Sequence, residues 1–126
     1  MSGYAIEPRR VEKPWGWELI WAETDDYVGK LLFVKAGESL SLQYHEVKDE
    51  SWYVQEGRAE LELSRLGDDE REVVVIAPGD CYRFRAGTVH RVRAIEDTLV
   101  VEVSTPQLDD VVRLEDAYGR AGTAEP

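Results

Sequence analysis

The sequence has a single cysteine, Cys81, only two histidines, and no apolar run of the length that a membrane span requires. One cysteine excludes an internal disulfide and agrees with a reducing compartment. The missing apolar run argues against a membrane partner. The N-terminus also lacks the charged-then-apolar order of a secretory signal. Together these absences predict a cytoplasmic protein.

Basic residues are also scarce. The chain has 15 lysines and arginines against 26 acidic residues, which gives a formal net charge of -11. This charge opposes non-specific binding to nucleic acid, and an anionic ligand would need a local basic patch. A chain of 126 residues fits one domain that can bury a core without a structural metal. Any bound metal is therefore expected to serve function first.

Helical periodicity is missing from most of the chain. Short segments of β pattern alternate with turn signals, and this pattern predicts an all-β fold, as a small barrel or a two-sheet sandwich. One exception is residues 108–114, where the spacing and the early Asp109 and Asp110 predict a short C-terminal helix. The expected strands are residues 17–21, 27–35, 40–45, 51–54, 59–63, 73–76, 82–84, 90–94 and 99–103.

The chain divides into three expected parts. Residues 1–11 form a polar N-terminal lead, residues 12–120 form the single domain, and residues 121–126 form a disordered tail.

Four residues have the spacing of a metal site built on strands: Gln43, His45, Glu50 and His90. Gln43 and His45 stand two apart, so on a strand their side chains share one face. A tight turn after His45 would return Glu50 to the same face, and His90 would arrive from a later strand. Two imidazoles, a carboxylate and an amide oxygen suit Zn²⁺, with Fe, Mn or Ni as other possibilities. A plain salt bridge is the alternative for Glu50.

These residues belong to two longer motifs, Gly37-x5-Gln43-x-His45-x4-Glu50-x6-Gly57 and Gly79-x5-Arg85-x-Gly87-x2-His90. The motifs resemble those of the cupin superfamily, whose members carry metal ligands in a jelly-roll barrel. Three positions depart from the usual cupin pattern, with Gln43 in place of His, Arg85 in place of Pro and Ala94 in place of Asn.

A Gln-x-His opening is the form found in phosphomannose isomerases. The resemblance to the cupin domain of type II phosphomannose isomerases spans residues 12–120, although Lys48 stands where that family has Arg. In those proteins the domain usually follows a sugar-nucleotide guanylyltransferase domain. The matching stretches are Lys13-Pro14-Trp15-Gly16, Leu40-Ser41-Leu42-Gln43, Glu50-Ser51-Trp52, His90-Arg91, Glu102-Val103, Asp109-Asp110-Val111-Val112-Arg113 and Asp116-Ala117-Tyr118-Gly119-Arg120.

This resemblance implies a metal-dependent sugar-phosphate isomerase that interconverts an aldose and a ketose through an enediol. Lys48 and Lys30 are the candidates for proton transfer, with exposed strand lysines as the alternative. Candidates for substrate binding are Arg83, Arg85, Arg91 and Trp52, against solvent-exposed arginines and a core tryptophan as the alternatives.

Two other functions stay open at this stage. One is a metal-dependent cupin dioxygenase, which the Gln ligand disfavours. The other is a non-catalytic module that binds a sugar or a nucleotide sugar. The resemblance also implies a homodimer, because small cupins often pair through their strands.

Overall fold

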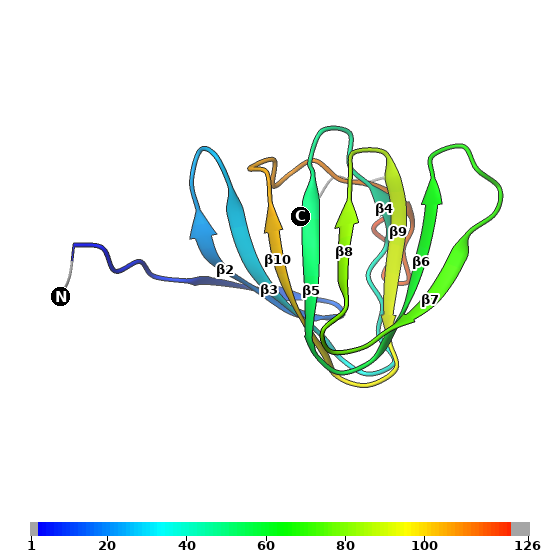
Figure 1. Cartoon of the computed structure of the whole chain (residues 1–126), viewed down its shortest axis with the longest axis horizontal. Helices are drawn as coiled ribbons and strands as arrows, with labels where there is room; N and C mark the ends of the chain where they lie inside the picture. The colour runs from blue at the N-terminus through cyan, green and yellow to red at the C-terminus, as the bar shows by residue number, and fades with distance from the viewer. Residues whose placement is uncertain (1–2, 122–126) are drawn as a thin grey trace.

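The computed structural model describes residues 3–121, and within that range it contains eleven strands and no helix. The strands form two antiparallel sheets, which confirms the predicted all-β fold. Figure 1 shows the strands standing side by side as two facing walls, with the N-terminal segment extending away from them. None of the described residues forms a helix that could cross a membrane.

The larger sheet has six strands in the order β1-β2-β3-β10-β5-β8. Most of its central strands alternate buried and exposed positions, so one face packs inward. We call this sheet A. Its strands are β1 Arg9–Lys13, β2 Gly16–Glu23, β3 Val28–Val34, β10 Thr98–Ser104, β5 Glu50–Glu56 and β8 Cys81–Phe84.

The smaller sheet, sheet B, has five strands in the order β11-β4-β9-β6-β7. Its bounds are β11 Val112–Glu115, β4 Leu42–Tyr44, β9 Thr88–Ala94, β6 Ala59–Arg65 and β7 Glu72–Ile76. The core lies between the two sheets and is built mainly from aliphatic side chains, with Trp15, Trp52 and Phe84 as its large aromatic members.

The predicted C-terminal helix over residues 108–114 is wrong. Residues 106–111 turn tightly instead, because Leu108 N–H donates to the Pro106 carbonyl at 2.9 Å and Val111 N–H donates to the Asp109 carbonyl at 3.1 Å. The chain then enters β11, which pairs with the short strand β4 and forms the edge of sheet B. A segment of this length is marginal as an isolated helix, so pairing with an open sheet edge decides its structure.

One strand begins before the expected start of the domain at residue 12. Strand β1 begins at Arg9, inside the expected 1–11 lead, and pairs with β2. Residues 122–126 of the expected tail lie outside the described residues.

The glycine that ends the first motif has a clear structural reason. Gly57 joins β5 to β6 with a φ of 93°, a left-handed value that favours glycine. A Cβ there would also lie 2.2 Å from the Asp97 carbonyl oxygen. This turn ends β5, the strand that begins with Glu50.

Candidate metal centre

Three of the four predicted ligands converge inside the barrel. Glu50 Oε1 lies 3.3 Å from His45 Nε2 and 3.1 Å from His90 Nε2. One ligand atom from each residue lies within 4.8 Å of the others, and all three residues are buried. The residues between His45 and Glu50 form the turn that the spacing predicted, so the carboxylate returns to the side of the imidazoles.

The hydrogen bonds of the two histidines leave their Nε2 atoms facing the carboxylate. His90 Nδ1 lies 2.9 Å from the Thr88 carbonyl oxygen, and His45 Nδ1 contacts the Asp110 carbonyl oxygen. A carbonyl only accepts, so each Nδ1 carries a proton and each Nε2 is directed at Glu50, the tautomer that leaves Nε2 as the metal-binding atom of a neutral ring. Both Nε2 atoms are buried without a hydrogen-bond partner among the described residues. Two lone pairs and a carboxylate that face one another fit a bound divalent cation.

Gln43 adds an amide beside this group. It pairs directly across the sheet with His90 and lines the same cavity. Its Oε1 accepts a hydrogen bond of 2.6 Å from Ser41 Oγ, which fixes the direction of the amide. Coordination by Gln43 stays a prediction, while its place next to the His90 strand position agrees with the expected shared face.

Glu50 is held in its ionised form. Burial raises its pKa, but contacts from His45 and His90 and the charge of Lys48 together hold the pKa well below its usual range. Lys48 Nζ lies 3.0 Å from Glu50 Oε2 and 3.6 Å from Glu102 Oε2. Burial and the charge of Glu50 raise the pKa of Glu102, whose Oε1 accepts from Trp52 Nε1 at 2.9 Å.

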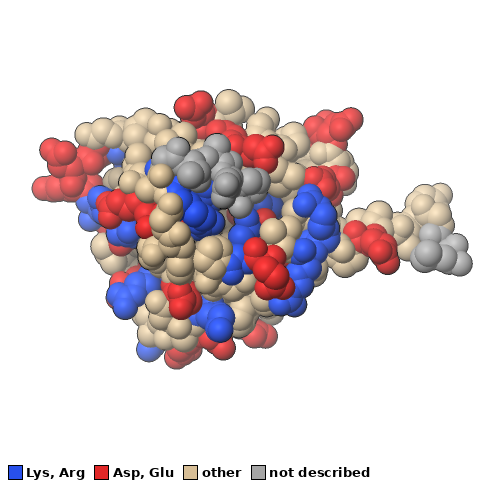
Figure 2. Space-filling model, turned by 180° about the vertical axis from the view of Figure 1, so that it is seen from behind, with Lys and Arg blue, Asp and Glu red and all other residues tan. Residues whose placement is uncertain are grey.

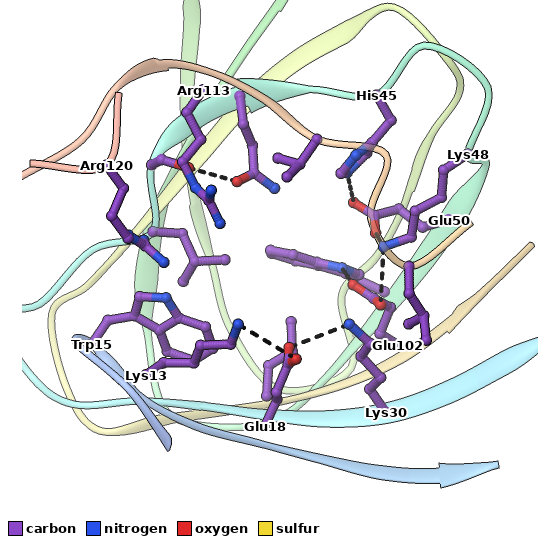
Figure 3. A pocket seen from close by; sticks show the side chains of 17 residues that line it. Lys13, Trp15, Glu18, Lys30, His45, Lys48, Glu50, Glu102, Arg113 and Arg120 are labelled. Atoms are coloured by element: carbon purple, nitrogen blue, oxygen red, sulfur yellow. Dashed lines mark hydrogen bonds and ion pairs between the residues drawn. The ribbon is translucent and has the colours of Figure 1, made fainter. Parts of the chain in front are cut away.

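Two members of the triad, His45 and Glu50, line one side of a cavity with about 560 Å³ of empty space, part of it open to solvent. His90 is not among the described residues that line it and reaches the site through its contact with Glu50. Figure 3 shows His45, Lys48 and Glu50 on one side and Arg113 and Arg120 on the other. Lysines and acids also line the wall between them, with Glu18 Oε2 3.3 Å from Lys30 Nζ and Glu18 Oε1 3.7 Å from Lys13 Nζ. The cavity is therefore strongly charged, and most of its cations lie away from the triad.

Several cations of the cavity lie close enough to Lys13 to affect its pKa. Burial lowers its pKa, the charge of Glu18 raises it, and the charges of Lys30, Arg120 and Arg113 lower it further. Three other cations thus act on Lys13 inside the cavity, although the whole chain is acidic. On the face seen in Figure 2, several basic side chains lie near the middle, with acidic side chains both among them and around the outline.

The other predicted site residues divide into two groups. Lys30, Lys48 and Trp52 line the cavity. The described residues that line it do not include Arg83, Arg85 or Arg91. Arg83 pairs with Asp49 at 2.6 Å and Arg91 pairs with Glu62 at 3.0 Å, while Arg85 is exposed after β8.

Five further charged residues line the cavity, and the sequence pattern did not identify them as site residues: Lys13, Glu18, Glu102, Arg113 and Arg120. For two of these residues, strand periodicity in the sequence could have indicated an inward-facing side chain. Glu18 shares strand parity with buried Ile20, and Glu102 shares it with buried Val100. A charged residue at an inward position of a strand is a candidate for a functional cavity.

The comparisons with known proteins agree with this geometry. The cupin domain family model matches residues 30–105. The xanthan biosynthesis protein XanB of Xanthomonas campestris pv. campestris is 33% identical over 117 residues, which cover 89% of this chain and 24% of that protein. The mannose-1-phosphate guanylyltransferase ManC of Salmonella typhimurium is 33% identical over 116 residues, which cover 89% of this chain and 23% of that protein. The chain thus spans about a quarter of the length of these curated relatives.

A solved structure shares the fold. The capsular polysaccharide assembling protein CapF of Staphylococcus aureus superposes with a TM-score of 0.78 at 16% identity, over 90% of this chain and 33% of that protein. The predicted resemblance is confirmed by the motifs, the two sheets and the matched segment, and the chain belongs to the cupin domain family.

Proposed function

We propose that this chain is a metal-dependent sugar-phosphate isomerase of phosphomannose-isomerase type. The observation that carries the proposal is a cavity lined at one side by His45 and Glu50 of the His45–Glu50–His90 triad and elsewhere by several lysines and arginines. One relative is named a mannose-1-phosphate guanylyltransferase, which favours a phosphorylated sugar as the ligand.

The triad would hold a divalent metal, with Gln43 as a fourth ligand. Zn²⁺ suits this donor set best, and Fe, Mn and Ni are the alternatives. When bound, the metal would supply Lewis acidity toward the sugar oxygens.

The basic residues would hold the phosphate. Arg113 is buried, and Arg120 is fixed by Asp116, which accepts from its Nε and Nη2 at 3.1 Å each. Guanidinium groups suit phosphate because their N–H groups match its oxygens in pairs. Since both lie inside the cavity, we favour them over Arg83, Arg85 and Arg91 as phosphate contacts. Trp52 would contribute an apolar wall beside the sugar.

The reaction would move a proton from C2 of the aldose to C1, and a hydroxyl proton from O2 to O1, through an enediol. Lys30 and Lys48 remain our candidates for these transfers. Each lies against a carboxylate, Lys30 against Glu18 and Lys48 against Glu102, so each pair offers a proton donor and an acceptor.

The test is turnover of mannose 6-phosphate and fructose 6-phosphate by the metal-loaded protein in deuterated water. We expect interconversion with deuterium entering at C1 or C2, and loss of both in His45→Ala. Arg113→Gln should raise KM far more than Arg91→Gln, which serves as the surface control. Tight binding of a sugar phosphate without any turnover would instead identify a non-catalytic sugar-binding module.

We also propose that the chain forms a homodimer through the outer face of sheet A. The residues Leu19, Leu31, Val101, Tyr53 and Cys81 lie in one cross-strand row over five strands, and none of them is charged. Nearby Trp21 and Val103 are 40% and 50% exposed. Monomers rarely expose continuous apolar patches of this kind.

A second copy is the occupant that we favour, because this row is uncharged and two chains of charge -11 can meet across it with least repulsion. Charged residues lie at its margins, with Arg10 opposite Leu19 and Arg83 two positions after Cys81. The outer face of sheet B carries the ion pair of Glu62 and Arg91 within its inner strands. Sedimentation velocity should show a dimer that Val101→Asp disrupts and that Val75→Asp, on exposed β7, leaves intact. A monomeric wild type at high concentration would refute this interface.

A further inference from the structure

One residue outside the ligand set ties two parts of the metal centre together. Asp110 lies in the turn that precedes β11, more than sixty positions after the loop 46–48 that it contacts. Its Oδ1 accepts from the Glu46 N–H at 3.0 Å. Its Oδ2 accepts from the Val47 N–H at 2.7 Å and the Lys48 N–H at 2.8 Å. One carboxylate therefore collects three successive backbone donors.

The same residue also contacts a ligand directly. The backbone carbonyl of Asp110 accepts from His45 Nδ1, which leaves Nε2 to face Glu50. A carbonyl in this position fixes both the tautomer and the ring plane of a metal-binding histidine.

His45 depends on this support more than His90 does. His90 lies within β9 and pairs with β4 on one side and β6 on the other. His45 follows Tyr44, the last residue of β4, and so lies outside the regular ladder. Its backbone carbonyl accepts from the Gly87 N–H at 2.8 Å, but its ring takes its direction from Asp110.

The loop 46–48 also depends on Asp110 for its conformation. It connects His45 to Glu50 and carries Lys48, whose Nζ pairs with Glu50 Oε2. Three N–H groups directed at one carboxylate resemble an anion-binding nest and hold the loop in one shape. A loop that moved would shift His45 and Glu50 relative to each other.

We propose that Asp110 is a positioning residue of the metal centre, holding His45 through its carbonyl and the loop 46–48 through its carboxylate. This inference rests on the proposed metal site. The turn that carries Asp110 also places Leu108 and Val111 in the cavity wall.

The test is the affinity for Zn²⁺ of wild type, Asp110→Ala, Asp110→Asn and Asp109→Asn, by competition with a chromophoric chelator. Asp110→Ala keeps the backbone carbonyl at His45 and removes the carboxylate that holds the loop 46–48. We therefore expect it to weaken binding by about 10-fold, the lower end of the effect of losing an outer partner of a metal site. Asp110→Asn should fall between, because one oxygen remains to accept. Asp109→Asn, an exposed neighbour, should change affinity by no more than about twofold.

A second readout separates positioning from simple destabilisation. The visible spectrum of the Co²⁺-loaded protein reports ligand geometry, and circular dichroism confirms that each variant is folded. We expect altered Co²⁺ spectra for both Asp110 variants and an unchanged spectrum for Asp109→Asn. If Asp110→Ala does not fold, Asp110→Asn decides the outcome.

Two results overturn the inference in distinguishable ways. A folded Asp110→Asn with a lower melting temperature but wild-type Zn²⁺ affinity and Co²⁺ spectrum would make Asp110 purely structural, with the metal site intact. A wild type that binds neither ion would remove the proposed metal site itself and the inference with it.

Discussion

At the scale of single residues, the cavity is built from buried charges that lie against partners. Glu18 pairs with Lys13 and Lys30, and Lys48 lies between Glu50 and Glu102. Moving such groups out of water costs free energy, which their mutual attraction only partly offsets. An apolar filling would stabilise the barrel at least as well, so this arrangement is better explained by function than by stability.

Trp52 provides a test of how much one such contact contributes. Its Nε1–H donates to Glu102 Oε1 at 2.9 Å, and its side chain is 3% exposed. Trp52→Phe keeps an aromatic ring but removes the donor from a buried carboxyl. We expect the free energy of unfolding to fall by about 2 kcal/mol in guanidinium titrations, the cost of an unsatisfied buried acceptor.

Trp21→Phe is the matched control. Trp21 is 40% exposed and lies on the outer face of sheet A. Its substitution should change stability by no more than about 0.5 kcal/mol. Equal losses in the two variants would mean that ring size, and not the bond to Glu102, sets the effect.

At the scale of elements, the turn after β11 fixes one side of the cavity. Asp116 accepts from the Arg120 backbone N–H at 2.7 Å and also from its guanidinium, and its side chain is fully buried. Within the same turn, Tyr118 donates to Glu38 and accepts from the Ser39 N–H at 3.3 Å. This short segment therefore attaches the end of the domain to the loop before β4.

The Asp116 contact has a predictable pH dependence. Burial raises the pKa of this carboxyl, but the donors of Arg120 outweigh it and lower the pKa below its ordinary value. A lowered folded-state pKa gives stability that is complete above the unfolded value, about 3.9, and is lost as pH falls through the folded value.

We therefore expect Asp116→Asn to be less stable than wild type at neutral pH, by about 2 kcal/mol. The difference should shrink as pH falls below about 4, because wild type loses the same charge. Urea unfolding at a series of pH values measures both quantities. A difference that stays constant with pH would show that the ionised carboxylate is not the stabilising form.

The sequence predicted most of the strands but not how they pair. Alternation located the main strands, and the two motifs predicted the triad, because both signals are local and repeat with the strand period. Strand β11 was missed because its residues also fit a helical spacing. Only its pairing with β4 decides between helix and strand. Arg83 and Arg85 were expected at the site, yet both flank Phe84, whose buried side chain sends theirs to the outside.

At the scale of the whole molecule, global charge and local charge have opposite signs. The chain carries a net charge of -11, while Lys13, Lys30, Lys48, Arg113 and Arg120 all line one cavity. Acidic residues elsewhere keep the outer surface repulsive toward polyanions, and the enclosed cations attract a small anion that can enter the cavity. The net charge therefore opposes non-specific binding to nucleic acid, while the cavity keeps cations that suit the proposed phosphorylated sugar.

The size of the domain also sets how metal removal should affect stability. The core cluster between the sheets packs Trp15, Val54, Leu61, Ile76 and Phe84 without help from the triad, so we expect the metal-free chain to remain folded. A metal that binds only the native state at about 100 times its Kd adds roughly 2.7 kcal/mol. For a domain of this size that raises the melting temperature by roughly 10 °C.

Chelation followed by calorimetry measures this increment. We expect one cooperative transition in both states, with the metal-loaded protein melting higher, and no metal-dependent shift in His45→Ala. The control is Arg91→Gln, which changes the outer face of sheet B and should keep the full shift. Two results would contradict this account: a chain that unfolds on chelation, which would make the metal part of the fold, or a wild type whose melting temperature ignores the metal. The second result would also remove the ligand role of the two buried Nε2 atoms, since a cation bound between them must stabilise the state in which they converge.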